Sequence, residues 1–133
     1  MNPFQSEDGV YIIAEIGGNH EGDFDYAVHL TELAAQSGAN AIKFQIYTGD
    51  SLVNPRYDPQ RNQHFKKFQL DQSEYLELAR ITRSHKLTFM ASVWDPLALK
   101  WIDPHIPIYK VGSGDLTARN LIESFIATQK PLI

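Results

Sequence analysis

Two kinds of apolar segment alternate along this chain, and their alternation restricts the fold more than any other feature. The first kind is short, rich in β-branched residues and typical of buried strands: residues 10–16, 41–46, 87–92 and 108–111. The second kind carries apolar residues at helical spacing: residues 23–38, 73–85, a segment from Pro96 onward, and 121–126. Strands that alternate with helices pair in parallel through right-handed crossovers. The sequence therefore predicts an α/β fold with a parallel sheet covered by helices.

Short polar residues and glycine mark the predicted helix ends. Asp23, Asp95 and Thr117 are predicted N-caps, because their side chains can accept hydrogen bonds from the free N–H groups of a first turn. Gly38 is the predicted end of the first helix. After the last helix, residues 130–133 are predicted to begin a fifth strand.

Periodicity alone does not separate an open doubly wound sheet from a closed barrel. A complete eight-unit barrel needs roughly 250 residues, so 133 residues would be about half of one. Residues 1–9 are expected to form a short lead-in. Residues 47–70 form a long polar segment, and connections of that length are usually functional or disordered.

Composition excludes several classes of function. The formal net charge is -4, so the chain has no overall basic field for nucleic acid or an anionic membrane surface. It has no cysteine, which excludes disulfides and thiolate chemistry and fits a cytoplasmic location. No apolar run approaches membrane-spanning length. An anionic ligand would have to be bound by a few local cations.

Polar residues stand where the predicted strands end, which is where parallel barrels carry their chemistry. They are Glu15, Lys43, Gln45, Ser92, Lys110, Ser113 and Asp115. Lys43 and Gln45 are two residues apart in one strand, so they share a face, predicted to be the barrel interior. Lysines at the ends of two strands favour an anion site, and nearby hydroxyl and N–H groups suit a phosphate and a carboxylate together.

Each of these residues also has a structural interpretation. Lys43 and Glu15 are also explained by a buried ion pair, and the carboxylates by charge balance for the lysines. The turn at Gly112, Ser113 and Gly114 is also typical of an ordinary connection before a helix. Ser92 is also explained as a partner for a strand-end carbonyl.

The histidines and tryptophans give weaker signals. His20 lies in a glycine-rich turn, where a hydrogen-bonded structural role is at least as well supported as a catalytic one. The other histidines lack metal-ligand spacing, so no metal ligand is predicted. Trp94 and Trp101 are predicted to pack in the core.

Three segments in register resemble the N-acetylneuraminate (sialic acid) synthase family. They are residues 12–23 (IIAEIGGNHEGD), 38–45 (GANAIKFQ) and 109–116 (YKVGSGDL). Order and spacing agree from about residue 10 onward. The legionaminic and pseudaminic acid synthases share the pattern, so the resemblance specifies a type of reaction more firmly than a sugar.

The resemblance implies that residues 10–133 are the N-terminal portion, about half, of a TIM-type (β/α)8 barrel that stops at the fifth strand, without the family's C-terminal antifreeze-like domain. It implies a cytoplasmic transferase of surface carbohydrate biosynthesis, homodimeric at full length. Such an enzyme condenses phosphoenolpyruvate with an open-chain N-acetylated amino sugar such as N-acetylmannosamine. A divalent metal, Mn²⁺ or Mg²⁺, is expected, with ligands beyond residue 133. The chain alone is therefore expected to be inactive.

The resemblance also implies individual roles. The residues implied around phosphoenolpyruvate are Lys43, Ser92, Lys110 and Ser113, with Gln45 beside it. Glu15 and Asp115 are the implied catalytic residues, at the sugar and the attacking water. Residues 91–95 (ASVWD) depart from the family's common Ser-Thr-Pro-Phe-Asp, and Asp115 stands where glutamate is common. The shorter acid reaches less far, which affects the sugar preference.

Two other functions stay open on the sequence. A lysine, Lys43 or Lys110, could form a Schiff base in an aldolase-like barrel, activated by desolvation. Alternatively, a non-catalytic half-barrel could bind an anion or associate with a second copy through its open sheet edges.

Overall fold

Three parallel strands form the centre of the structure, a computed structural model that describes residue 4 and residues 9–133. The elements in chain order are β1 (Ile13–Gly17), α1 (Phe24–Gln36), β2 (Ala41–Ile46), α2 (Gly49–Leu52), α3 (Pro59–Phe68), α4 (Gln72–Ser84), β3 (Thr88–Val93), α5 (Leu99–Ile102) and α6 (Arg119–Ala127). Two 3₁₀ turns, Asp103–His105 and Ser113–Asp115, lie in the segment between α5 and α6. The predicted α/β fold with a parallel sheet is confirmed.

The spatial order of the strands equals their order in the chain. The sheet runs β1-β2-β3, with Ala41 opposite both Ile13 and Thr88. Isolated parallel bridges join Ala91 to Tyr109 and Tyr109 to Leu132, which continues the same order. The strands predicted at 108–111 and 130–133 are therefore present only as bridged residues, although backbone hydrogen bonds link the two segments.

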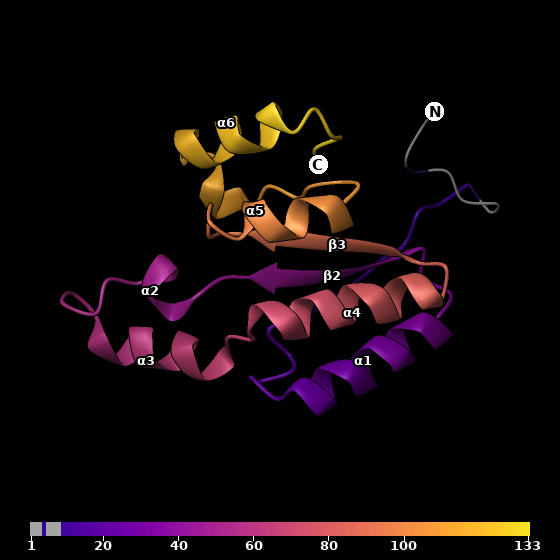
Figure 1. Ribbon diagram of the computed structural model, residues 1–133, viewed down its shortest axis with the longest axis horizontal. Coiled ribbons are helices and arrows are strands. Elements are labelled where there is room, and N and C mark those ends of the chain that lie inside the picture. The colour runs from indigo at the N-terminus through magenta and orange to yellow at the C-terminus, as the bar shows by residue number, and fades with distance from the viewer. Residues whose placement is uncertain (1–3, 5–8) are drawn as a thin grey trace.

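One face of the sheet carries the helices. Strand side chains alternate in direction, and those that enter the main hydrophobic core are Ile16, Ile42, Phe44, Ile46, Phe89, Ala91 and Val93. Helices α1 and α4 lie side by side against this face (Figure 1). Tyr109 joins the same core, where its ring stacks on Phe125 of α6 at a centroid distance of 4.9 Å.

The opposite face, called the inner face below, changes character along the strands. Near the strand beginnings it is apolar, with buried Ala41, Met90 and Ile108. Phe4 and Tyr11 pack against these residues, and the Tyr11 hydroxyl donates to Thr88 Oγ1 at 2.8 Å. Near the strand ends the inner face is polar. Only the carboxyl-terminal half of this face is therefore equipped for a polar ligand.

Helix caps were predicted with mixed success. Asp23 is the N-cap of α1, accepting a hydrogen bond from the Tyr26 amide at 2.9 Å. The helix predicted from Pro96 is present but begins later: Asp95 caps a turn by accepting from the Leu97 amide, and α5 runs only from Leu99 to Ile102. The Thr117 cap is wrong, because Ala118 occupies the N-cap of α6 and no side chain caps it.

The polar segment 47–70 is not the structureless connection that its composition favours, because it contains α2 and α3. Asn62 of α3 is fully buried and its Nδ2 donates to the carbonyl oxygens of Gly49 and Val53 at 3.1 and 2.8 Å. The hydrogen bond from Asn62, followed by the contact with Lys66, holds the pKa of Asp50 below its usual range. These contacts fix α2 on α3 beyond the carboxyl-terminal ends of β2 and β3 (Figure 1).

None of the helices in the part of the chain that the structure describes is both long and apolar enough to cross a membrane.

Candidate functional site

The polar half of the inner face centres on Lys43. Strand pairing places Lys43 beside Glu15 of β1, and Gln45 beside Ser92 of β3. The Lys43 ammonium forms an ion pair with Glu15 Oε2 and lies 3.5 Å from Ser92 Oγ. Lys43 is 9% exposed, whereas the Glu15 side chain is 45% exposed. A buried cation is thus shared between a solvated carboxylate and a hydroxyl.

Gln45 is held by a hydrogen bond from a helix as well as by strand pairing. Its carbonyl oxygen accepts a 2.6 Å hydrogen bond from the hydroxyl of Tyr75 on α4. Burial raises the pKa of the Tyr75 hydroxyl, so it stays a donor. The predicted common face of Lys43 and Gln45 is confirmed, since the alternating Ile42, Phe44 and Ile46 all enter the helix-side core.

Lys110 lies on the same face by alternation. Its neighbours Ile108 and Tyr109 pack in the inner-face cluster and the helix-side core respectively, so Lys110 follows Ile108 onto the inner face. Tyr109 pairs with Ala91 in a parallel bridge, so the residues that follow them, Lys110 and Ser92, lie at the same height in the sheet. Its ammonium donates to the Val111 carbonyl at 2.6 Å, so the structure does not bring it into contact with Lys43.

Ser113 and Asp115 stand apart from the Lys43 cluster. Ser113 is exposed at the start of the 3₁₀ turn Ser113–Asp115. Asp115 turns toward the end of β3, where its Oδ2 accepts a 2.6 Å hydrogen bond from the indole Nε1 of Trp94. The predicted site residues therefore divide into a contacting group (Glu15, Lys43, Ser92), neighbours on the inner face (Gln45, Lys110), and a turn that carries Ser113 and Asp115.

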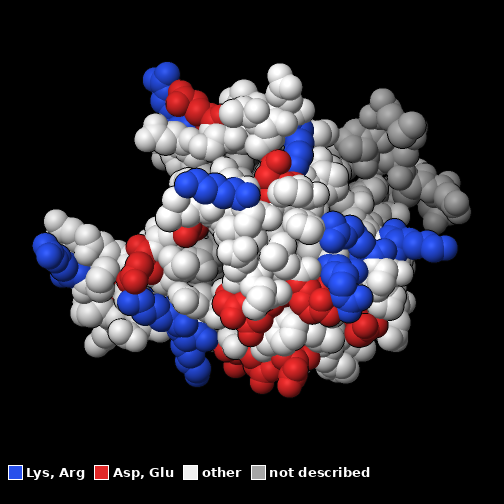
Figure 2. All heavy atoms as spheres, viewed as in Figure 1, with Lys and Arg blue, Asp and Glu red and all other residues white. Residues whose placement is uncertain are grey.

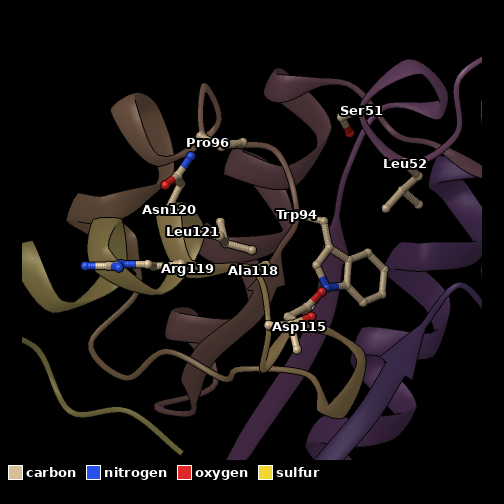
Figure 3. A pocket seen from close by; sticks show the side chains of 10 residues that line it. Ser51, Leu52, Trp94, Pro96, Asp115, Ala118, Arg119, Asn120 and Leu121 are labelled. Atoms are coloured by element: carbon tan, nitrogen blue, oxygen red, sulfur yellow. Dashed lines mark hydrogen bonds between the residues drawn. The ribbon is translucent and has the colours of Figure 1, made fainter.

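Several cavities lie around the strand ends, and three of them border Gln45 or the Trp94–Asp115 pair. One of about 310 Å³ is lined by Gln45, Trp94, Asp115 and residues of the α2–α3 segment, and is called the inner pocket below. A second, of about 500 Å³, lies on another side of Gln45 against Tyr47, His64, Phe65 and Phe68. The third, of about 630 Å³, is the outer pocket, between α2 and the beginning of α6 (Figure 3). Gln45 and the Trp94–Asp115 pair thus stand at the borders between cavities.

Most of the residues that line these cavities were not predicted from the sequence. Trp94 packs against the main hydrophobic core as predicted, but its indole N–H also reaches Asp115 and its side chain lines two cavities. Phe65 and Arg61 of α3 line the inner pocket, with the Arg61 guanidinium 5.7 Å from the centre of the Phe65 ring. The unusual length of segment 47–70, with its aromatic and basic residues, was the available signal.

Charge is distributed unevenly over the surface. Lys and Arg side chains gather over α3 and over the far end of α4, and Asp and Glu side chains over the edge formed by α1 (Figure 2). Helix α3 carries Arg61, Lys66 and Lys67 and has no acidic residue. Lys66 is paired with Asp50, so the attraction of an anion to this side of the strand ends would come mainly from Arg61 and Lys67.

His20 has the environment of a structural residue. It is 1% exposed, and its Nδ1 accepts a 3.1 Å hydrogen bond from the Gly22 amide, whereas Nε2 is buried without a hydrogen-bond partner in the described structure. Desolvation lowers the pKa of His20, against a smaller raising effect of the Gly17 backbone. The imidazole is accordingly neutral and supports the turn after β1.

Acidification should therefore destabilise the chain. The unfolded chain takes up a proton on His20 near pH 6.5, before the folded chain does, so this contribution is complete above pH 6.5 and is lost as the pH falls through the lower folded pKa. We expect His20→Gln to flatten the slope of unfolding free energy against pH in urea titrations. His29→Gln, at an exposed position, is the control. His105, whose pKa is also lowered by burial, would account for the remaining slope; an unchanged slope in His20→Gln would contradict the assignment.

A metal centre cannot be built from the described residues. Among residue 4 and residues 9–133, no three His, Cys, Asp or Glu side chains come together in a way that could hold a metal ion. No described residue is therefore assigned as a metal ligand.

Comparison with known proteins agrees with this arrangement. The model of the NeuB family matches residues 30–133. An uncharacterised protein of Methanocaldococcus jannaschii is 35% identical over 92% of this chain and 36% of its own length. N-acetylneuraminate-9-phosphate synthase of Homo sapiens is 29% identical over 92% of this chain and 38% of its own length.

A solved structure has the same fold. The crystal structure of N-acetylneuraminic acid synthetase from Leptospira borgpetersenii, in complex with citrate, superposes with a TM-score of 0.85 at 28% identity. The match covers 92% of this chain and 42% of that one. This chain therefore spans about two fifths of the length of the relatives it matches.

Proposed function

Because this chain belongs to the NeuB family, we propose that it forms the phosphoenolpyruvate-binding part of a synthase that condenses phosphoenolpyruvate with an N-acetylated amino sugar. The relatives named above are synthases of N-acetylneuraminic acid or its 9-phosphate, or uncharacterised. The sugar class comes from the family resemblance, with N-acetylmannosamine as the type substrate. The product would be a sialic or related nonulosonic acid for surface carbohydrate.

The buried ammonium of Lys43 carries this proposal. It lies in the polar half of the inner face, 3.5 Å from the Ser92 hydroxyl, with Gln45 and Lys110 on the same face. Phosphoenolpyruvate has a phosphate and a carboxylate on a three-carbon frame, which two separate cations and a hydroxyl can bind together. An incoming anion would share or replace Glu15 as the partner of Lys43, and Glu15 is solvated enough to be released.

The proposed reaction needs one group that gives a proton to the aldehyde oxygen and one that takes a proton from the attacking water. The C3 carbon of phosphoenolpyruvate bonds to the aldehyde carbon of the sugar, whose oxygen takes up a proton. Water adds to C2 and loses a proton, and the C–O bond to phosphate then breaks to leave a 2-keto acid and free phosphate. We assign Glu15 and Asp115 to the sugar and the attacking water, in agreement with their places beside Lys43 and in the inner pocket.

We also propose that the strands of this chain belong to a closed barrel. Strands that follow one another in the sheet as they do in the chain, with α1 and α4 on one face, support the N-terminal portion of a (β/α)8 barrel. Lys43, Gln45, Ser92 and Lys110 would then face its interior. A divalent metal, Mn²⁺ or Mg²⁺, belongs to the proposal for the complete reaction, with ligands outside the described residues. The cytoplasmic location and the homodimer stay predictions.

The proposal is tested by giving the chain its substrates. We expect residues 1–133 to bind phosphoenolpyruvate in a calorimetric titration but to release no phosphate when N-acetylmannosamine and Mn²⁺ are added. Phosphate release that Lys43→Ala abolishes would establish the reaction and contradict the expected inactivity. Absence of phosphoenolpyruvate binding would contradict the proposal, and borohydride trapping of pyruvate on a lysine would favour the Schiff-base alternative.

A further inference from the structure

Trp94 and Asp115 join two segments that meet only in the folded structure. Trp94 follows the last residue of β3, and its backbone amide donates to the Ile46 carbonyl of β2 at 2.9 Å. Its ring packs against Tyr47, with centroids 5.8 Å apart. The indole is therefore held at its backbone and along its ring, and its N–H is directed at Asp115 Oδ2 (Figure 3).

The other side of the carboxylate is confined by backbone. A methyl group on Gly112 would lie 2.6 Å from Asp115 Oδ2 and 3.8 Å from the Trp94 indole nitrogen, so a larger residue at 112 would displace the carboxylate. The Asp115 amide donates to the Gly112 carbonyl at 2.9 Å, which closes the turn around this space. Gly114 differs, because a methyl group there would meet nothing within 4 Å.

The pair also forms a partition. Trp94 and Asp115 both line the inner pocket, which contains Gln45, and both line the outer pocket next to α6. The hydrogen bond from the indole to one carboxylate oxygen favours the observed orientation of the Asp115 side chain at the wall of the inner pocket. A free aspartate would rotate between several orientations.

We propose that Trp94 is a positioning residue for Asp115, because its indole N–H fixes the carboxylate at the wall of the inner pocket. There the second carboxylate oxygen accepts a hydrogen bond from a hydroxyl group of the amino sugar. This proposal rests on the proposed function, since it takes Asp115 to face that substrate. It also makes the pair a determinant of sugar selectivity, because the width of the indole and the length of the acid together set how far the carboxylate extends.

The hydrogen bond can be observed without any ligand. The chain has two tryptophans, Trp94 and Trp101, so its ¹⁵N spectrum holds two indole signals and one is an internal control. We expect Asp115→Ala to move the Trp94 signal and speed its exchange with water, with Trp101 unchanged. Gly112→Ala should do the same by displacing the carboxylate, whereas Gly114→Ala should not. If Asp115→Ala left the position and the exchange rate of the Trp94 signal unchanged, the proposal would be overturned.

The positioning role is tested by binding of N-acetylmannosamine in the presence of phosphoenolpyruvate. Loss of a hydrogen bond to a charged group predicts about 10-fold weaker sugar binding in Trp94→Phe, with phosphoenolpyruvate affinity unchanged. Asp115→Glu in the Trp94→Phe background should recover part of the loss, because the longer acid extends into the space that the indole leaves. Trp94→Phe variants that lose both ligands equally would indicate only a packing role and overturn the inference.

The remaining outcomes separate this inference from the function on which it rests. Wild-type chain that binds phosphoenolpyruvate but not the sugar would overturn the inference and leave the phosphoenolpyruvate site standing. Phosphoenolpyruvate affinity that is insensitive to Lys43 would instead contradict the proposed function. In that case the ¹⁵N spectra would still decide whether Trp94 holds Asp115.

Discussion

Replacing Lys43 with methionine is expected to weaken phosphoenolpyruvate binding by about 100-fold, because at least one charge-assisted hydrogen bond and a buried counter-charge are lost together. Methionine keeps the length and the apolar stem of lysine, so the packing around β2 is preserved. Titration calorimetry with phosphoenolpyruvate measures the effect. Lys66→Met is the matched control, since Lys66 pairs with Asp50 at 2.9 Å but its side chain is 39% exposed.

The same variant separates the anion site from a structural ion pair. If the pair with Glu15 served stability alone, Lys43→Met would leave an unpaired carboxylate and lower the free energy of unfolding. Because the Glu15 side chain is 45% exposed, water can solvate it once Lys43 is gone, and we expect little change in stability. A large loss of stability with unchanged phosphoenolpyruvate binding would establish the structural interpretation.

Gly22→Ala is expected to be the most destabilising of the small substitutions proposed for this chain. Gly22 has φ +81°, and a methyl group there would overlap the backbone carbonyl oxygen of Lys67 and come within 3.3 Å of Phe68 Cα. Backbone strain alone should cost about 1 kcal/mol, and the displacement of α3 about 2 kcal/mol more. Urea unfolding of this variant measures the total loss, expected to be about 3 kcal/mol.

Gly38→Ala isolates the strain from the overlap. Gly38 has nearly the same backbone, with φ +83°, but a methyl group there would meet nothing within 4 Å. Its loss of stability should therefore stop at about 1 kcal/mol. Equal losses in the two variants would mean that the turn after β1 and the end of α3 do not pack as closely as described.

The sheet was predictable because the apolar runs and the period-two alternation of its strands are local features of the sequence. The run Ala41–Ile46 was predicted with its observed bounds, and period-two alternation placed Lys43 and Gln45 on one face. The first strand was predicted to begin at residue 10, yet β1 begins at Ile13: the Ile12 amide donates to the Asn40 side chain rather than to a strand carbonyl, and Val10 is 67% exposed. Apolar content alone does not determine where pairing begins.

Features that depend on distant contacts were not predictable. Helices α2 and α3 have little apolar periodicity, and the hydrogen bonds of Asn62 that fix them join residues nine or more positions apart. Trp94 and Asp115 each had a sufficient local explanation, as a core residue and as a substitute for glutamate. Their hydrogen bond spans 21 positions and is seen only once the turn Ser113–Asp115 is placed against the end of β3.

The agreement between strand order and chain order bears on how the protein emerges from the ribosome. Each strand pairs with the strand that precedes it in the sequence, so no early segment must wait for a distant partner. Glu15, Lys43 and Ser92 can meet as soon as β3 has left the exit tunnel, before α6 is made. The sheet can therefore grow one unit at a time during translation, and the cationic face assembles early while the carboxylate of Asp115 arrives later.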